Sequence, residues 1–249
     1  MGIMAGMMAP AVPLLLACAI LLVASATQAL TGFGFSLVAV PLLAALTDPR
    51  TAVVGTSLAG PLLALATAVR DRGHVRWRTV ALLVGATVLG MPVGILVLAT
   101  TPQRALTALI GLVALACTLL VWRGLRLRGG AGTVGAVGVL SGVLSTSTGT
   151  AGPPLIAAFQ AMGYGPRAFR GTLAAVFSGS GVLSLAGLAL GGQVRAAGVA
   201  VGLAGAPAVA VGWWTGNRLF DRVDPVRFRR LALAGLLLSS AATLARAAL

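Results

Sequence analysis

The stretch that decides the fold covers residues 28–50 and reads QALTGFGFSLVAVPLLAALTDPR. It holds a glycine-containing break at Thr31–Gly34, then an uncharged apolar run at Phe35–Leu46, which the turn residues Thr47–Arg50 end. Twelve helical residues measure about 18 Å at a rise of 1.5 Å per residue, which is too short for the ~30 Å core of a bilayer. In a membrane, we therefore expect this short helix to begin inside the lipid.

The composition is that of a membrane protein. Apolar residues make up 58% of the 249 positions and charged residues 9%, whereas soluble domains carry about 25% charged residues. Uncharged runs of about 20 residues recur along the chain and can each cross a bilayer as a helix. The sequence predicts an all-α polytopic membrane protein with a single transmembrane domain over residues 1–249. Nucleic-acid binding is disfavoured despite the net charge of +14.

The apolar runs predict ten helical segments in two halves. Repeat one covers residues 11–122 and repeat two covers 131–249, with a basic linker at 123–130. No basic residue precedes the first run, so we expect a retained helix rather than a cleaved signal peptide. The predicted segments are 11–30, 35–46, 51–69, 79–99 and 104–122, then 133–147, 155–162, 168–190, 196–217 and 228–249.

Short motifs recur between the halves in the same order. Thr31–Gly32 recurs as Thr148–Gly149, and Pro49–Arg50 recurs as Pro166–Arg167, both 117 residues later. Each half then holds a helix–break–short helix hairpin. Five segments are an odd number, so the second half would enter the membrane upside down. Two inverted repeats of this kind are typical of secondary transporters, whose substrate site lies near the midplane.

The arginines predict the orientation. All 18 basic residues are arginines, and the ten-segment arrangement places 14 of them in loops at one face, which would be cytoplasmic. Asp71 and Arg170 are assigned to these loops. Both termini would then lie outside the cytoplasm of a multi-pass protein in the cell membrane. The opposite face keeps Arg50, Arg104, Arg195 and Arg246.

The two breaks predict a binding site for a small anion. A helix that begins inside the membrane exposes unpaired N–H groups and a partial positive charge, glycines let the backbone approach a ligand, and hydroxyls add donors. The alternative is that these glycines allow close helix packing while the hydroxyls bond local carbonyls. The substrate-binding residues predicted on this basis are Thr31, Gly32, Gly34, Ser36, Thr148, Gly149, Thr150, Gly152 and Pro153.

Further polar residues lie inside apolar runs. Gln28 and Gln160 either reach the same site or join helices to one another, since polar groups are costly in a bilayer. Hydroxyls on the third and eighth segments either face the cavity or bond to their own helix, and the second interpretation is favoured. These hydroxyls belong to Thr56, Ser57, Ser178 and Ser180.

Enzyme chemistry has no basis in the sequence. No His/Cys/Asp cluster, nucleophile–base pair or phosphate-binding loop occurs, so we predict no enzyme, no metal and no cofactor. No Asp or Glu lies in the middle of a span, which leaves a carboxylate proton relay unsupported.

The sequence resembles the sulfite exporter TauE/SafE family, also called the toluene sulfonate uptake permeases. The matching stretches are TGFGFSLVAVPLL at 31–43, SGVLSTSTGTAGPP at 141–154 and PRAFRGT at 166–172. Members commonly have a Gly-Gly-Gly run at the first break. This chain has Phe33 and Phe35 there, and both are expected to shape the first half of the site.

The resemblance implies transport of small sulfur-containing anions such as sulfite, sulfonates or sulfoacetate. We expect a secondary transporter, an exporter that works by alternating access. An anion channel with a continuous pore and a membrane scaffold without a ligand remain the alternatives. The expected partners are the small anionic substrate and the lipid bilayer, with room for a homo-oligomer.

Overall fold

The described chain is entirely helical. A computed structural model describes residues 2–123 and 131–219, so the predicted helix at 228–249 lies outside the described residues. This all-helical chain confirms the predicted fold class, and no strand occurs within these two ranges. The helices are α1 (Gly2–Thr31), α2 (Phe35–Leu46), α3 (Pro49–Arg70), η1 (Arg72–His74), α4 (Trp77–Thr100), α5 (Gln103–Arg123), α6 (Ala131–Ser147), α7 (Gly152–Ala161), α8 (Pro166–Leu190) and α9 (Ala196–Leu219).

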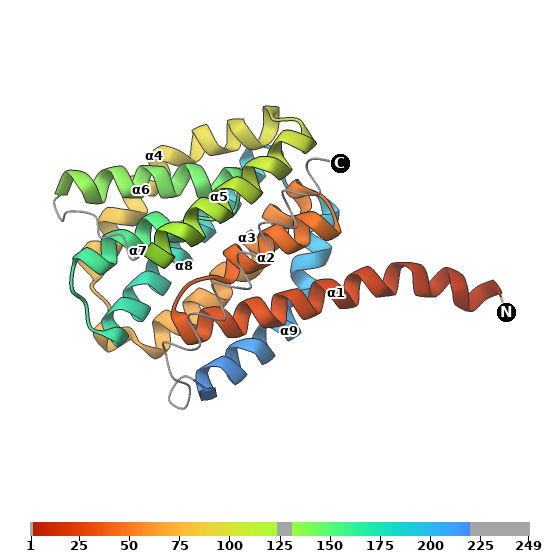
Figure 1. The fold of residues 1–249 in the computed structure, drawn as a ribbon, viewed down its shortest axis with the longest axis horizontal. Helices are drawn as coiled ribbons and strands as arrows, with labels where there is room; N and C mark the ends of the chain where they lie inside the picture. The colour runs from red at the N-terminus through yellow and green to blue at the C-terminus, as the bar shows by residue number, and fades with distance from the viewer. Residues whose placement is uncertain (1, 124–130, 220–249) are drawn as a thin grey trace.

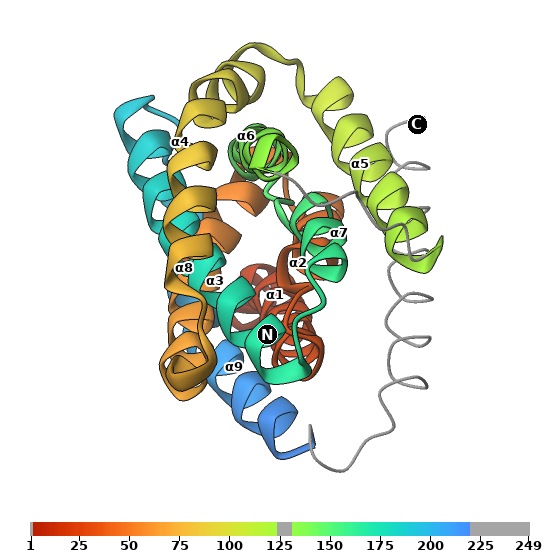
Figure 2. The ribbon, with the colours of Figure 1, turned by 90° about the vertical axis from the view of Figure 1, so that its left-hand side faces the viewer.

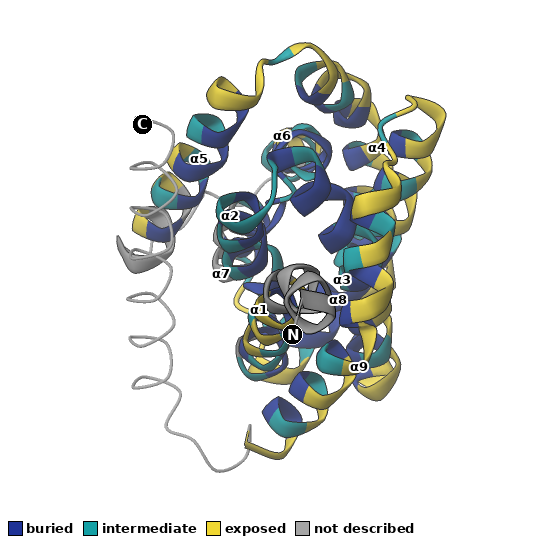
Figure 3. Cartoon of the chain, turned by 90° about the vertical axis from the view of Figure 1, so that its right-hand side faces the viewer, coloured by how far each residue is buried: buried dark blue, intermediate teal, exposed yellow. Residues whose placement is uncertain are grey.

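The outer surface of the helices is apolar. Four described helices, α3, α4, α8 and α9, are long and apolar enough to cross a membrane. Their outward faces are exposed (Figure 3), and they carry large hydrophobic side chains such as Leu82, Leu89, Leu190 and Leu203, which are 62–92% exposed. Contiguous apolar surface of this extent requires a lipid environment. The protein is a multi-pass membrane protein.

The first short helix has the predicted bounds. Gly34, at φ 105°, ends the break, and α2 begins at Phe35. The next helix starts at once because the Asp48 carboxylate accepts a hydrogen bond of 3.0 Å from the Thr51 N–H while Pro49 occupies the first turn. An acidic N-cap followed by proline is a strong start signal.

The second short helix begins earlier than predicted. α7 starts at Gly152 and not at Leu155. Proline fits the first turn of a helix because the N–H that it lacks would be unpaired there anyway, so Pro154 belongs to the helix and not to the break. The second break therefore covers residues 148–151.

Helices from the two predicted repeats interlock. α4 packs along α6, and α1 packs along α9, as Figures 1 and 2 show. Glycines make both contacts close: a Cβ added at Gly90 would meet the Val139 carbonyl, and one added at Gly212 would meet Leu22 and Ser25. The Gly-xxx-Gly motifs at residues 90–94 and 212–216 are therefore packing faces. α3 and α8 pack together in the centre.

Replacing Gly90 by alanine is expected to destabilise the protein by about 1–3 kcal/mol, the usual cost of overpacking. Gly85 on the same helix is the matched control, because a Cβ there meets nothing within 4 Å. Gly85→Ala should be neutral, or stabilising by up to about 1 kcal/mol through helix propensity. The free energy of unfolding in detergent measures both, and equal values for the two variants would contradict the packing role.

Candidate functional site

The first break joins α1 to α2 through two glycines in the left-handed region. Gly32 has φ 82° and Gly34 has φ 105°, conformations that residues with a Cβ rarely adopt. The Gly32 N–H still donates to the Gln28 carbonyl at 2.7 Å, which closes the last turn of α1. The chain then turns so that the first N–H groups of α2 have no carbonyl in their own helix.

The second break joins α6 to α7 in a similar way. Gly149 has φ 68°, and the N–H groups of Thr148 and Thr150 both donate to the Leu144 carbonyl at the end of α6. The Thr148 and Thr150 hydroxyls lie 2.6 Å apart. The break is thus held by its own hydrogen bonds, and α7 begins directly after it.

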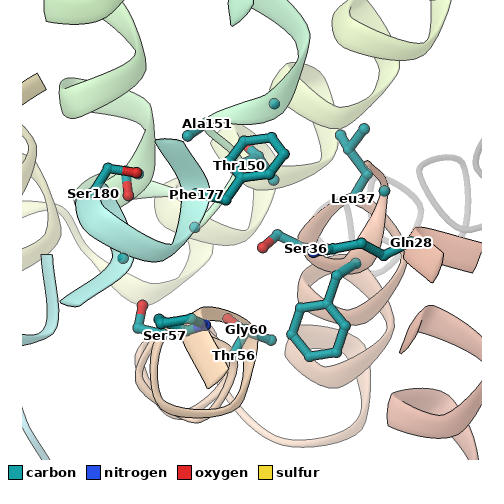
Figure 4. Close-up of a pocket in the computed structure, with 17 residues that line it drawn as sticks. Gln28, Ser36, Leu37, Thr56, Ser57, Gly60, Thr150, Ala151, Phe177 and Ser180 are labelled. Carbon is teal, nitrogen blue, oxygen red and sulfur yellow. The ribbon is translucent and has the colours of Figure 1, made fainter. Parts of the chain in front are cut away.

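Both breaks open on one cavity of about 60 Å³. The first turn of α2 and the start of α7 line it from two sides, while α3 and α8 complete the wall (Figure 4). The lining residues are Gln28, Gly34, Phe35, Ser36, Leu37, Thr56, Ser57, Gly60, Pro61, Ser145, Gly149, Thr150, Ala151, Gly152, Phe177, Ser180 and Gly181. A water needs about 10–15 Å³ of such space, so the cavity has room for several waters or one small oxyanion.

Residues 16–243 match the family described as "Sulfite exporter TauE/SafE". The chain belongs to this family. Members are transporters, so this TauE/SafE protein is not an enzyme. It is 30% identical over 228 residues to the "Probable sulfite/organosulfonate exporter TauE" of Cupriavidus necator, with 87% of this chain and 88% of the relative covered. No solved structure matches the chain.

The cavity brings together seven of the predicted site residues, which come from both breaks. They are Gln28, Gly34, Phe35, Ser36, Gly149, Thr150 and Gly152. Three others lie outside its lining: Gly32 packs against Arg170, Phe33 packs on an apolar cluster, and Thr148 lies behind Thr150. The side chains of Thr31, Pro153 and Gln160 lie outside the described residues.

The polar side chains in the wall differ in whether their hydrogen-bond donors already have an acceptor. Thr56 donates to the carbonyls of Ala52 and Val53, and Ser180 donates to the Val176 carbonyl at 2.7 Å. Within the described residues, no hydrogen bond occupies the side chains of three other lining residues. These are Gln28, Ser36 and Ser57, and Figure 4 shows Ser36 and Ser57 around the same space.

None of the described lining residues carries a charge. The positive potential available to an anion therefore comes from the two helix N-termini. Two aromatic rings, Phe35 and Phe177, and the ring of Pro61 form the apolar part of the wall. Such a wall keeps bulk water away and so strengthens the remaining polar contacts.

Sequence reasoning missed the wall residues from the central helices. Ser145, which shares a 2.8 Å hydrogen bond with Ser184, and Phe177 line the cavity, but neither was among the predicted site residues. Ser57 and Ser180 were only secondary candidates. Their sequence signal, a hydroxyl in the middle of an apolar run, does not tell a lining residue from one bonded to its own helix.

Asp71 lies in the turn after α3, as assigned, but Arg170 lies in α8 and not in a loop, and both side chains are buried. Arg170 is 5% exposed and Asp71 is 7% exposed, and the guanidinium donates to both carboxylate oxygens at 2.7 and 3.1 Å. Arg170 lies in the first turns of α8, and Asp71 caps the end of α3. Burying a charge in a membrane protein requires a partner, and each residue supplies the other.

Proposed function

We propose that the protein is a secondary transporter that exports a small sulfur-containing oxyanion of the sulfite or sulfonate class. The supporting observation is the cavity in which the starts of α2 and α7 meet. Membership of the TauE/SafE family and the name of the Cupriavidus relative agree with this substrate class. The substrate binds between the two helix starts.

The chemistry of the cavity suits an oxyanion better than a cation. An oxyanion has only acceptors, and the wall offers unpaired backbone N–H groups together with the donors of Gln28, Ser36 and Ser57. Sulfite has four heavy atoms, a size that a cavity of about 60 Å³ accommodates. A site without a fixed cationic side chain also releases its anion readily, as transport requires.

Transport proceeds by alternating access, with the cavity opening first to one face and then to the other. The inverted repeats predicted from the sequence would place the site near the midplane, an arrangement typical of alternating access. The face at which the predicted topology places 14 of the arginines is cytoplasmic, and the proton or membrane gradient drives export. Counterflow of labelled sulfite in proteoliposomes tests the carrier mechanism, and flux without saturation or counterflow would indicate a channel.

The hydroxyls of Ser36 and Ser57 are expected to bind the anion. A hydrogen bond to a charged group contributes about 1.5–3 kcal/mol, so Ser57→Ala or Ser36→Ala should weaken sulfite binding roughly ten- to hundredfold. Calorimetric titration of the purified protein with sulfite, and with an aliphatic sulfonate in parallel, measures the change.

Ser180→Ala is the matched control. Ser180 lines the same cavity, but its proton is donated to the Val176 carbonyl, so it has little to offer an acceptor. Its removal should change affinity by less than about threefold, within the net worth of one neutral hydrogen bond. Equal losses in the serine variants and the control would show that the free donors do not bind the substrate.

A further inference from the structure

A buried ion pair joins the two halves of the molecule at one end of the helices. Arg170 of α8 holds Asp71 through two hydrogen bonds of 2.7 and 3.1 Å. Its guanidinium also donates to the Ala29 carbonyl at 3.3 Å and to the Asn217 side-chain oxygen at 3.4 Å. The pair therefore connects α8 to the ends of α1, α3 and α9.

Arg170 also packs closely against the first break. A Cβ added at Gly32 would lie 3.1 Å from the Arg170 Cγ and 3.3 Å from its Cα, which is tighter than an ordinary van der Waals contact. Its contacts with the end of α1 and with the first break, at Ala29 and Gly32, lie between Gln28 and Gly34, which both line the cavity. Arg170 thus fixes the backbone that forms the first half-site.

The pair lies between the cavity and one face of the protein. α3 and α9 end there, α8 begins there, and Arg70, Arg72 and Arg218 are exposed around it. Phe177 of the cavity wall lies seven residues further along α8, about 10 Å deeper at the rise of a helix. We call this end the arginine-rich face.

Among the residues that the structure describes, no such ion pair lies against the second break. Gly149, 117 residues after Gly32, lies against Val40, Val53 and Thr56, and Val53 stands 117 residues before Arg170. Each break glycine thus meets the corresponding position of the other half, as the predicted repeat requires. Gly32 meets the side chain of Arg170, one member of the ion pair, whereas Gly149 meets two valines and a threonine, so the two breaks pack against different chemistry.

We propose that Asp71 and Arg170 are positioning residues that form a clasp, which holds the first half-site in place and closes the cavity at the arginine-rich face. The proposal rests on the proposed function only in taking the cavity as the substrate site. The clasp separates when the cavity opens to this face, where water replaces the lost partner of each charge. A pair with this geometry is stable closed or hydrated open, but not half separated.

Side-specific cysteine labelling tests the clasp without any substrate. In a Cys18→Ala, Cys117→Ala background, Ser57→Cys reports access to the cavity. A membrane-impermeant cationic methanethiosulfonate reagent is applied to each face of oriented vesicles. The paired substitution Asp71→Asn with Arg170→Met removes both charges of the pair at similar volume, so that neither charge is left without the other.

The paired variant should label at Ser57→Cys at least about tenfold faster from the arginine-rich face, because the labelling rate follows the open population. Labelling from the opposite face should stay unchanged. Arg218→Met, which removes an exposed arginine at the same face, should have no effect. A reporter at Ala174, which is 0% exposed in the core, should remain unlabelled.

Unchanged labelling at Ser57→Cys in the folded paired variant would overturn the clasp. Faster labelling from both faces, or at Ala174→Cys, would overturn it as well, because the protein would then have loosened as a whole. The substrate is tested separately by sulfite titration. Failure to bind sulfite together with faster one-sided labelling would support the clasp and refute the substrate.

Discussion

Gly149→Leu is expected to lower the affinity for sulfite by more than about tenfold, the equivalent of 1.4 kcal/mol. Gly149 has φ 68°, where a side chain costs roughly 1–2 kcal/mol. Its Cβ would also lie 2.9 Å from the Val40 Cγ2 of α2. The second break must then move away from α2, and the two half-sites separate. Calorimetric titration with sulfite measures the loss.

Gly163→Leu separates the strain of the backbone from the damage to the site. Gly163 has φ 65° and lies in the turn between α7 and α8, with nothing within 4 Å of an added Cβ. Gly163→Leu therefore introduces backbone strain similar to that of Gly149→Leu but does not change the cavity. Sulfite affinity should stay within about twofold, the scale of a few tenths of a kcal/mol. Equal losses in both variants would mean that Gly149 matters only for folding.

Local signals account for the parts of the fold that sequence reasoning predicted. The bounds of α2 follow from neighbours in the chain: glycines before Phe35, then Asp48 and Pro49 after the helix. Capping and proline rules act over a few residues, so a single sequence contains them. At α7 two prolines occur in a row, and the sequence alone does not tell whether they end the break or begin the helix; both lie in the first turn of α7.

The residues of the candidate site likewise fall into those with a local sequence signal and those without one. Residues beside the breaks, such as Ser36 and Gly149, were predicted because the breaks themselves were visible. Phe177 and Ser145 were missed because α6 and α8 reach the cavity only through tertiary packing. Ser57 has a free donor, whereas Ser180 does not. This difference comes from side-chain geometry, which hydropathy patterns do not encode.

The ion pair shows a limit of charge-based topology rules. These rules assign an arginine near a helix end to the aqueous loop, which describes Arg72 and Arg218, both exposed. Arg170 has the same kind of sequence context and yet is buried, because Asp71, 99 residues away, pairs with it. Only the packing of α3 against α8 reveals that these two charges, far apart in the sequence, form one buried unit.

Removing one member of this pair is expected to have the largest effect on stability. Asp71→Ala leaves the Arg170 guanidinium buried without its carboxylate, and Arg170→Ala leaves the carboxylate buried alone. Each should lower the free energy of unfolding by about 3–5 kcal/mol, the usual cost of breaking a buried pair. Unfolding in mixed micelles with rising denaturing detergent measures this cost. Arg218→Ala, which removes an exposed guanidinium stacked 3.7 Å from the Trp214 ring centre, should cost only about 0.5–1 kcal/mol.

The paired substitution completes the cycle and distinguishes a clasp from a mere anchor. Asp71→Asn with Arg170→Met should lower the free energy of unfolding by clearly less than the sum of the two single changes. The reason is that the paired variant removes both charges together. If the costs of the singles simply add, the two side chains stabilise the fold independently and no coupled element exists to open. If the paired variant is nearly as stable as the native protein and yet labels faster from the arginine-rich face, the charges were retained for controlled closure. A pair that contributes little net stability but fixes which face is shut is what an asymmetric transport cycle requires.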